Sequence, residues 1–380
     1  MISIENAKVV LEHQVLEDGV ILVENDRICW VGKRDEASVP QDAQRIDAQG
    51  SYVGPGFVDI HNHGGGGYRF DTDPIGAAKY FLAHGETTVL ATLYYNLSKE
   101  EFLEATRAVI AAMDTPDGRN IGGCYMEGPY MNPKYGASPD KNRWKGPIKE
   151  EDYQALTDCA GSYAKVWAIA PERDGIEGFV TCAKAKNPNV RFAVGHSEAT
   201  PAQVRKLKEY GLGIQTHCMN ATGRNTQWSG TRGCGPDEAC LLDKDMYAEL
   251  ICDSMAIHVN PDLQKLILQV KGVDKVVLIT DSFVSDQQSP EDLRHITDLS
   301  FDENRNLCGS RLTMDVVCRN IMKHTGCTLT QAFLMAATNP AKAVGMDADI
   351  GSVAPGKKAN LVFVDGAFQV KKVMLNGQLC

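Results

Sequence analysis

Residues 58–67 have the sequence VDIHNHGGGG, in which an apolar run ends at two histidines and four glycines follow. His61 and His63 are one residue apart, so the alternation of a strand points both side chains to the same face. This spacing predicts either a metal clamp at a strand end or two structural histidines. Glycines 64–67 predict a flexible loop, a close approach of the backbone to a ligand that a Cβ would obstruct, or both.

The chain is long enough for a large barrel and a small accessory domain, since its 380 residues exceed one average domain. Apolar residues make up 43% and charged residues 23%, which is typical of globular proteins. With a net charge of −10, the chain is a poor partner for nucleic acid or an anionic membrane. A local pair of arginines would still allow an anionic small-molecule substrate.

Neither a membrane span nor a signal peptide is expected. The chain has no apolar stretch of about 18 residues. Its first residues, MISIENAKVVLEHQ, lack a basic start followed by an apolar core. The 12 cysteines are scattered and form no CxxC motif. This usage predicts reduced, mostly buried thiols and a cytoplasmic location.

The middle of the chain alternates short apolar runs with helical patterns. Two of these patterns open with an N-cap, Ser98 and Thr200, and Glu101 completes a capping box with Ser98. Near-continuous apolar strands that alternate with helices predict a parallel sheet covered by helices. Eight such units predict an α/β fold, a (β/α)8 TIM barrel over residues 53–345, with its active site at the carboxyl ends of the strands. The runs are YVGPGFVDI, ETTVLATL, NIGGCYMEG, AKVWAIAP, VRFAVGHS, LGIQTHCMN, AELICDS and DKVVLITDS.

Both ends of the chain differ from the middle. Residues 1–52 contain runs rich in β-branched side chains, separated by turn signals such as Glu-Asp-Gly, and residues 346–380 follow the same pattern. Together these segments predict one small discontinuous β domain, similar to a β-sandwich, that is built from both termini.

Six metal-capable side chains lie at the ends of the apolar runs. Because the carboxyl ends of barrel strands converge on one mouth, these residues would surround one point although they are far apart in the sequence. A single histidine at a strand end is more often structural, but the whole set predicts a metal site. Imidazole and carboxylate together suit zinc, and also iron, cobalt or nickel. The residues are His61, His63, Glu127, His196, His217 and Asp281.

In this order, the same residues resemble the amidohydrolase superfamily and, more closely, its N-acetylglucosamine-6-phosphate deacetylase family. The resemblance covers nearly the whole chain, and GHSEAT and MEGP are specific to that family. It implies a (β/α)8 barrel, usually a homodimer in which the partner subunit helps at the phosphate of an amino-sugar substrate. The segments that carry it are PGFVDIHNHG, MEGPYMNP, GHSEAT, QTHCMNAT, DSMAIHVNP, LITDS, CGSRLTMDVVCRN, ATNPAKAVGM and GSVAPGKKANLVFVD.

The resemblance also implies roles for the metal-capable residues. Glu127, His196 and His217 match the ligands of the main metal. His61 and His63 match a second-metal pair that some family members retain and others lack. One or two divalent ions, zinc first among them, are therefore implied, with Glu127 as a bridging carboxylate.

Further matches concern catalysis and the substrate. Asp281 matches the catalytic acid and base, and a helix N-cap is the structural alternative. His258 matches a histidine that contacts the substrate near the scissile amide, with a loop-capping or buried hydrogen-bonded histidine as the alternative. Asn220 and Ala221 match the loop that holds the sugar.

Two segments depart from the family pattern, and both concern the substrate. Ser138 stands where the family has a histidine that contacts the substrate. In the loop after His217, Arg232 is the candidate to hold a sugar phosphate, and Arg224 is its rival. Trp228 in the same loop either stacks on a sugar face or packs structurally.

These residues predict a metal-dependent hydrolase that converts N-acetylglucosamine 6-phosphate into glucosamine 6-phosphate and acetate. A bound divalent metal lowers the pKa of its water to about 7. Asp281 would then move the proton, and His258 would donate to the carbonyl oxygen.

Three alternatives stay open: another N-acetyl amino sugar, of galactosamine type or unphosphorylated; another amide; or a barrel that has lost catalysis and serves as a scaffold. Relatives that act on cyclic amides often have a carbamylated lysine at the bridging position, where this chain has Glu127. That residue favours the deacetylase, and the complete ligand set argues against a scaffold.

Overall fold

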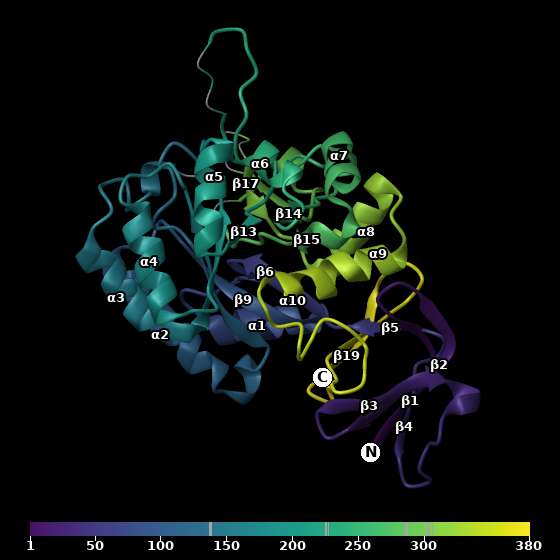
Figure 1. Ribbon diagram of the computed structural model, residues 1–380. Helices are drawn as coiled ribbons and strands as arrows, with labels where there is room; N and C mark the ends of the chain where they lie inside the picture. Colours follow the sequence, from purple (N-terminus) through teal and green to yellow (C-terminus); the bar gives the residue numbers. More distant parts are fainter. Residues whose placement is uncertain (137–138, 225, 227, 286–287, 302–304, 306) are drawn as a thin grey trace.

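The computed structural model describes residues 1–380 except 137–138, 225, 227, 286–287, 302–304 and 306. Figure 1 shows a barrel surrounded by helices and, at its lower right, a smaller β region to which both termini belong. The chain begins in this β region (purple), runs through the barrel, and returns to the β region at its end (yellow).

Eight strands within the described residues form a parallel sheet that is nearly closed into a barrel. Their order in the sheet is their order in the sequence, as successive βα units require. Two backbone hydrogen bonds join the ends of this sheet, from Asp281 N–H to His61 O (2.9 Å) and from His63 N–H to Ser282 O (2.8 Å). The predicted (β/α)8 fold is therefore confirmed. The strands are β6 (Phe57–Asn62), β9 (Glu86–Tyr94), β10 (Ile121–Glu127), β11 (Ala164–Ile169), β12 (Arg191–Val194), β13 (Leu212–Gln215), β14 (Tyr247–Ile251) and β15 (Val276–Ile279).

Helices cover the outside of the barrel (Figure 1). The helix α2 (Lys99–Met113) begins with a capping box of Ser98 and Glu101, and α5 (Pro201–Leu207) begins at the N-cap Thr200, so both predicted caps are confirmed. Among the helices of the described residues, none is both long and apolar enough to cross a membrane. Besides short 3-10 helices, the described residues also form α1 (Pro74–Ala83), α3 (Glu150–Ala160), α4 (Ile176–Lys186), α6 (Pro236–Leu242), α7 (Pro261–Lys271), α8 (Met314–Thr325), α9 (Leu329–Phe333), the π-helical η8 (Leu334–Thr338) and α10 (Asn339–Ala343).

Strands from both termini form a second sheet in the order β20-β19-β18-β5-β1-β2-β3, and β4 also pairs with β1. Because β4 pairs with the first half of β1 and β5 with its second half, the sheet branches at β1. It buries an apolar core of its own, which includes Ile21, Val53 and Phe363. The predicted β structure from both termini is confirmed, whereas the domain boundaries at 52/53 and 345/346 stay predictions. The strands are β1 (Ile2–Val10), β2 (Val15–Glu24), β3 (Arg27–Lys33), β4 (Gln44–Asp47), β5 (Tyr52–Pro55), β18 (Leu361–Val364), β19 (Val370–Leu375) and β20 (Gln378–Leu379).

The predicted strand YVGPGFVDI is divided into two strands at Gly56. The first, β5, pairs with β1 and β18 in the terminal sheet, whereas the second, β6, pairs with β9 in the barrel. A Cβ at Gly56 would lie 2.2 Å from the hydroxyl oxygen of Thr87, so the chain can cross here only without a side chain. One continuous apolar run therefore serves both sheets.

Three phenylalanines fill the space between the barrel and the terminal sheet. The ring centroids of Phe57, Phe333 and Phe368 are 5.0–5.9 Å apart, and each ring is almost completely buried. Phe333 also lies against the backbone of Gly54 in β5, where a Cβ would come within 2.3 Å of its ring. This cluster fixes the start of β6, and with it the strand that carries His61.

We expect Phe333→Ala to lower the free energy of unfolding by about 3–5 kcal/mol, because it removes a buried ring and leaves a cavity between the two sheets. Urea unfolding followed by circular dichroism measures the change. Tyr163→Ala is the matched control, since that ring is 38% exposed, and a change within about 0.5 kcal/mol is expected. Equal effects of the two substitutions would contradict the role of the cluster.

Candidate active site

Glu127, the last residue of β10, lies at the centre of the barrel mouth, and its side chain is buried. Its Oε1 lies 2.8 Å from His196 Nε2 and 3.2 Å from His217 Nε2, and these two nitrogens are 3.0 Å apart. His196 and His217 follow β12 and β13 by two residues each. Three potential ligand atoms from three strands thus meet at one point.

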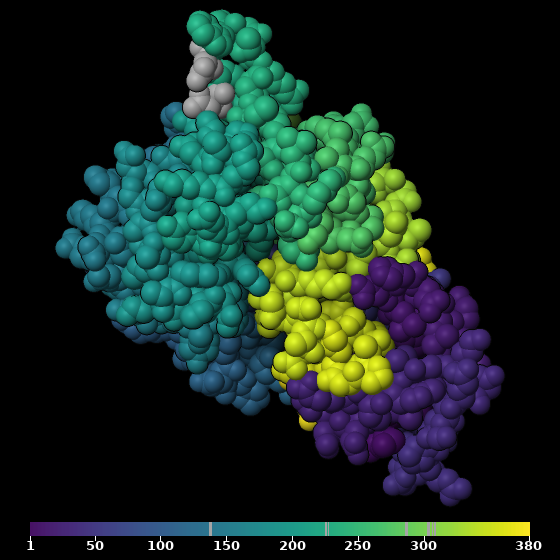
Figure 2. Space-filling model, viewed as in Figure 1, coloured from purple at the N-terminus to yellow at the C-terminus, as the bar shows by residue number. Residues whose placement is uncertain are grey.

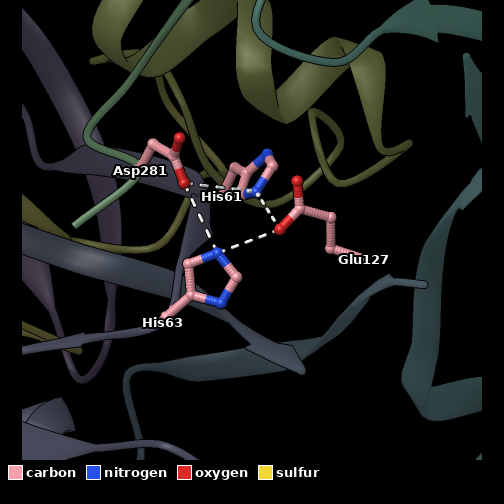
Figure 3. Close-up of side chains that lie close together, drawn as sticks. All are labelled: His61, His63, Glu127 and Asp281. Atoms are coloured by element: carbon pink, nitrogen blue, oxygen red, sulfur yellow. Dashed lines mark ion pairs between the residues drawn. The ribbon is translucent and has the colours of Figure 1, made fainter. Parts of the chain in front are cut away.

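The second oxygen of Glu127 faces another group, shown in Figure 3. Glu127 Oε2 is 3.0 Å from His63 Nε2 and 3.4 Å from His61 Nε2. Asp281 Oδ1 lies 3.4 Å from His63 Nε2 and 3.6 Å from His61 Nε2. The structure therefore brings all six predicted metal-capable residues together, with Glu127 between two groups.

Three of these residues have a backbone conformation that is uncommon for residues with a side chain. The φ angle is +45° at His196, +28° at His217 and +46° at Asp281. A left-handed φ costs such a residue about 1–3 kcal/mol and persists where the surroundings enforce it. Here it occurs directly after β12, β13 and β15, at the residues whose side chains surround Glu127.

A short hairpin is hydrogen-bonded to the segment that follows β15. It consists of β16 (Leu299–Phe301) and β17 (Leu307–Ser310). The hydroxyl of Ser310 donates to Thr280 O (2.6 Å), and Phe283 N–H donates to Ser310 O (3.0 Å). Asp281 is thus fixed between the hairpin on one side and the barrel-closing hydrogen bond to His61 on the other.

The nitrogens of the cluster have the arrangement of metal ligands. His61 Nε2 is buried and, among the described residues, has no hydrogen-bond partner. His196 Nε2 and His217 Nε2 face each other beside a single carboxylate oxygen. Converging imidazole and carboxylate groups are ligands of zinc and of iron, cobalt or nickel. The residues therefore fit a divalent metal ion, and Glu127 belongs to both groups that could hold one.

The charges of the cluster favour a cation at its centre. Burial alone would lower the pKa of His61, yet the carboxylates of Glu127 and Asp281 raise it well above its usual value. Burial alone would raise the pKa of Glu127, yet His61 and the other imidazoles hold it well below its usual range. The carboxylates thus stay ionised, and a metal cation can take the place of protons on the imidazoles.

Two buried carboxylates that sequence analysis missed hold histidines of the site. His61 Nδ1–H donates to Glu249 Oε2 (3.1 Å), which lies on β14. His258 Nδ1–H donates to Asp253 Oδ2 (3.0 Å), just beyond the same strand. A signal was present in AELICD, because an acid inside an apolar run needs a partner when it is buried.

The predicted sugar-binding residues lie in the loop after β13. Asn220 O accepts a hydrogen bond from His217 Nδ1–H (3.1 Å), and the Asn220 amide donates to His258 O (3.1 Å). Asn220 therefore connects the metal cluster to the predicted substrate histidine. Ala221 follows with a φ of +50°. Ser138 lies outside the described residues.

Arg224 and Arg232, the two candidates for holding a phosphate, share one acid. Arg224 Nε–H donates to Glu238 Oε1 (3.0 Å), and Arg232 Nη2 is 3.8 Å from the same oxygen. The segment of residues 228–234, which includes Trp228 and Arg232, forms a loop that projects from the body of the molecule at the top of Figures 1 and 2. The Trp228 side chain is 74% exposed there. The roles of all three residues stay predictions.

Comparison with known proteins identifies the family. The sequence profile of the Amidohydrolase family matches residues 52–380. This chain belongs to the amidohydrolase family.

Several relatives of this amidohydrolase carry a specific name. This chain is 30% identical over 338 residues to the N-acetylgalactosamine-6-phosphate deacetylase of Escherichia coli O157:H7, and the match covers 86% of both chains. It is 28% identical to the N-acetylglucosamine-6-phosphate deacetylase of Bacillus subtilis, covering 99% of this chain and 96% of that one. A solved mutant of N-acetyl-D-glucosamine-6-phosphate deacetylase from Mycobacterium smegmatis, in complex with N-acetyl-D-glucosamine-6-phosphate, matches with a TM-score of 0.83 and 27% identity, covering 100% and 98% of the chains.

The glycines after His63 form a tight hairpin of β7 (Gly64–Gly65) and β8 (Tyr68–Arg69). A Cβ at Gly64 would lie 2.2 Å from Tyr68 O, and its φ is +143°. At Gly67 the φ is +94°, but no heavy atom lies within 4 Å of a Cβ. The tight contact that glycine permits at position 64 is with the hairpin's own backbone, next to His63.

We expect Gly64→Ala to weaken metal binding by about tenfold or more, because the added Cβ displaces the backbone next to His63. The amount of zinc retained per subunit after dialysis measures this. Gly67→Ala shares the unfavourable backbone conformation but adds no clash, so it should retain metal as the unaltered chain does. Equal metal loss in both variants would show that conformational strain, and not the clash, is responsible.

Proposed function

We propose that this amidohydrolase is a metal-dependent deacetylase that converts N-acetylglucosamine 6-phosphate into glucosamine 6-phosphate and acetate. The observation that carries the proposal is the Glu127 carboxylate between two groups of metal-capable side chains, in a chain whose relatives are deacetylases of amino-sugar phosphates. N-acetylgalactosamine 6-phosphate is the second candidate substrate, favoured by the 30% identity to the Escherichia coli enzyme.

Zinc is the ion we propose, in one or two copies, held by Glu127 with His196 and His217 and by Glu127 with His61 and His63. Iron, cobalt or nickel would suit the same ligands. When bound, the ion supplies Lewis-acid activation of water and of the amide carbonyl.

Asp281 is the residue that we propose to move the proton. Burial alone would raise its pKa, but His61 and His63 hold it below its usual range, so the carboxylate is ionised and can accept a proton. Asp281 Oδ1 takes the proton from the attacking water and delivers it to the nitrogen of the leaving amine as the C–N bond breaks.

His258 is proposed to donate to the amide oxygen. Asp253 accepts hydrogen bonds from the His258 ring and from the backbone N–H groups of Ile257 and His258. Burial alone would raise the pKa of Asp253, but these hydrogen bonds lower it, so Asp253 is an ionised acceptor. His258 is thereby held with its Nδ1–H toward Asp253, which leaves the Nε2 side of the ring to face the amide oxygen and stabilise charge on it.

The phosphate of the substrate is proposed to bind Arg232, with Arg224 as the alternative, and Trp228 to stack on the sugar. We also propose a homodimer, because exposed apolar side chains gather after β14 and on α7, where Leu263 and Leu266 share one face. The projecting loop of one subunit would then help at the phosphate of its partner's substrate. The cytoplasmic location stays a prediction.

The test of this function is acetate release from a panel of N-acetylglucosamine, N-acetylgalactosamine and their 6-phosphates. We expect kcat/KM to be at least about tenfold higher for a 6-phosphate than for the same free sugar. Arg232→Ala should lower kcat/KM for the phosphorylated sugar and leave that of the free sugar unchanged.

Metal removal is the control in the same assay. A chelator should abolish acetate release, and added zinc should restore it. Activity that survives with less than one metal ion per ten subunits would contradict the proposed chemistry.

Asp281→Asn is expected to lower kcat by about 10²–10⁴-fold, because the amide cannot accept the proton of the attacking water. Metal content, measured in parallel, should stay close to that of the unaltered chain. Asp274→Asn is the control, since Asp274 is exposed and precedes β15 at the opposite end of the same strand. If Asp281→Asn loses its metal, Asp281 is chiefly a ligand.

A further inference from the structure

Glu249 is a carboxylate in the interior of the barrel to which the proposed reaction gives no step. It lies on β14 between Ala248 and Leu250, and its side chain is completely buried. Its Oε2 lies 3.1 Å from His61 Nδ1, and the backbone N–H of His217 donates to the same oxygen (3.2 Å). Glu249 thus touches both metal-capable groups, one through a ring and the other through the backbone.

Burying a carboxylate is unfavourable by several kcal/mol unless it is paired and hydrogen-bonded. The ion partner of Glu249 is His61, whose side chain is equally inaccessible to solvent. A barrel strand made only of apolar side chains would avoid this cost. The packing of the barrel therefore does not explain why an acid occupies this position.

The geometry of His61 supplies the reason. A carboxylate only accepts hydrogen bonds, so the proton of the neutral imidazole is on Nδ1, facing Glu249. Nε2 is left as the nitrogen that can bind an ion once its proton is displaced, and it faces Glu127 Oε2 and Asp281 Oδ1 at 3.4 and 3.6 Å. This is the tautomer that binds a metal through Nε2.

The plane of the His61 ring is fixed as well. The ring of Tyr125 stacks on it at a centroid distance of 4.4 Å and an interplanar angle of 27°. The hydroxyl of Tyr125 is 2.9 Å from that of Thr216, which holds the tyrosine in place. With Glu249 at its edge and Tyr125 on its face, His61 keeps one orientation before any ion arrives.

We propose that Glu249 is a positioning residue that sets the affinity of the His61–His63 group for its ion, and far less that of the Glu127–His196–His217 group. The difference follows because Glu249 bonds the imidazole of His61 but only the backbone of His217. Glu249 also adds a third carboxylate, beside Glu127 and Asp281, to oppose the charge of a second divalent cation. The inference rests on the proposed two-ion site.

Equilibrium dialysis of the full chain against zinc tests this inference without any activity assay. For Glu249→Ala we expect the dissociation constant of one ion to rise by about 10–100-fold, as for other residues that orient metal ligands. The other ion should bind within about threefold of its original affinity. Glu249→Gln should fall between Ala and the unaltered chain, since its amide oxygen can still accept from His61 Nδ1–H.

Two further variants distinguish a positioning role of Glu249 from a general disturbance of the barrel structure. Glu86→Gln alters another buried acid of the barrel, which lies at the start of β9 and accepts from Met314 N–H, and it should leave both affinities unchanged. His63→Asn removes a ligand of the second ion. Adding Glu249→Ala to this variant should then change the dissociation constant of the remaining ion by no more than about threefold.

The outcomes distinguish the inference from the function on which it rests. If the unaltered chain binds two ions and Glu249→Ala binds both with unchanged affinity, or loses both equally, the positioning role is wrong and the proposed function stands. If the unaltered chain binds a single ion, the inference is wrong and a one-metal deacetylase remains. If it binds none, both fail.

Discussion

The hydrogen bonds that close the barrel between β6 and the segment after β15 are the constraint on which the candidate site depends. They join His61 to Asp281 and His63 to Ser282 through the backbone. Closure therefore occurs at three residues to which the proposed function assigns chemistry, His61, His63 and Asp281. Without it the first and last strands would lie at opposite edges of an open sheet, and Asp281 would not face the imidazoles of β6.

Closure also brings two acids, Glu127 and Asp281, together in a buried site. In the absence of a cation they would repel each other and would lose their hydration. Glu127 and Asp281 are two acids next to four imidazoles, and their pKa values lie below the usual range because the histidines outweigh burial. The pKa values of His61, His63 and His217 are raised by these acids, so protons on these three imidazoles partly balance them in the metal-free chain. Divalent ions would balance them more fully, so metal binding should contribute to the stability of the barrel mouth.

The sequence predicted the barrel and the six clustered residues because both follow from a simple pattern, an apolar run with a polar residue at its end. The run AELICD signalled a buried acid at Glu249 but could not reveal its partner, because the barrel must close before His61 lies beside it. The sequence did not divide YVGPGFVDI at Gly56 either, since both halves are apolar and the side chain that excludes a Cβ there, that of Thr87, is far along the chain. Long-range contacts decided both points.

The metal-capable residues and the substrate candidates are held to different degrees. Glu127 is the last residue of a strand, and His196 and His217 follow strands with a left-handed backbone, so the packed barrel holds the cluster. Arg232 and Trp228 lie on a projecting loop and are more than 70% exposed. Under the roles proposed for Arg232 and Trp228, a change in this loop would alter which sugar binds without moving the residues around Glu127. The barrel would then keep the proposed hydrolytic chemistry while its preference for one amino sugar changed, and the relatives are indeed named for two different sugars.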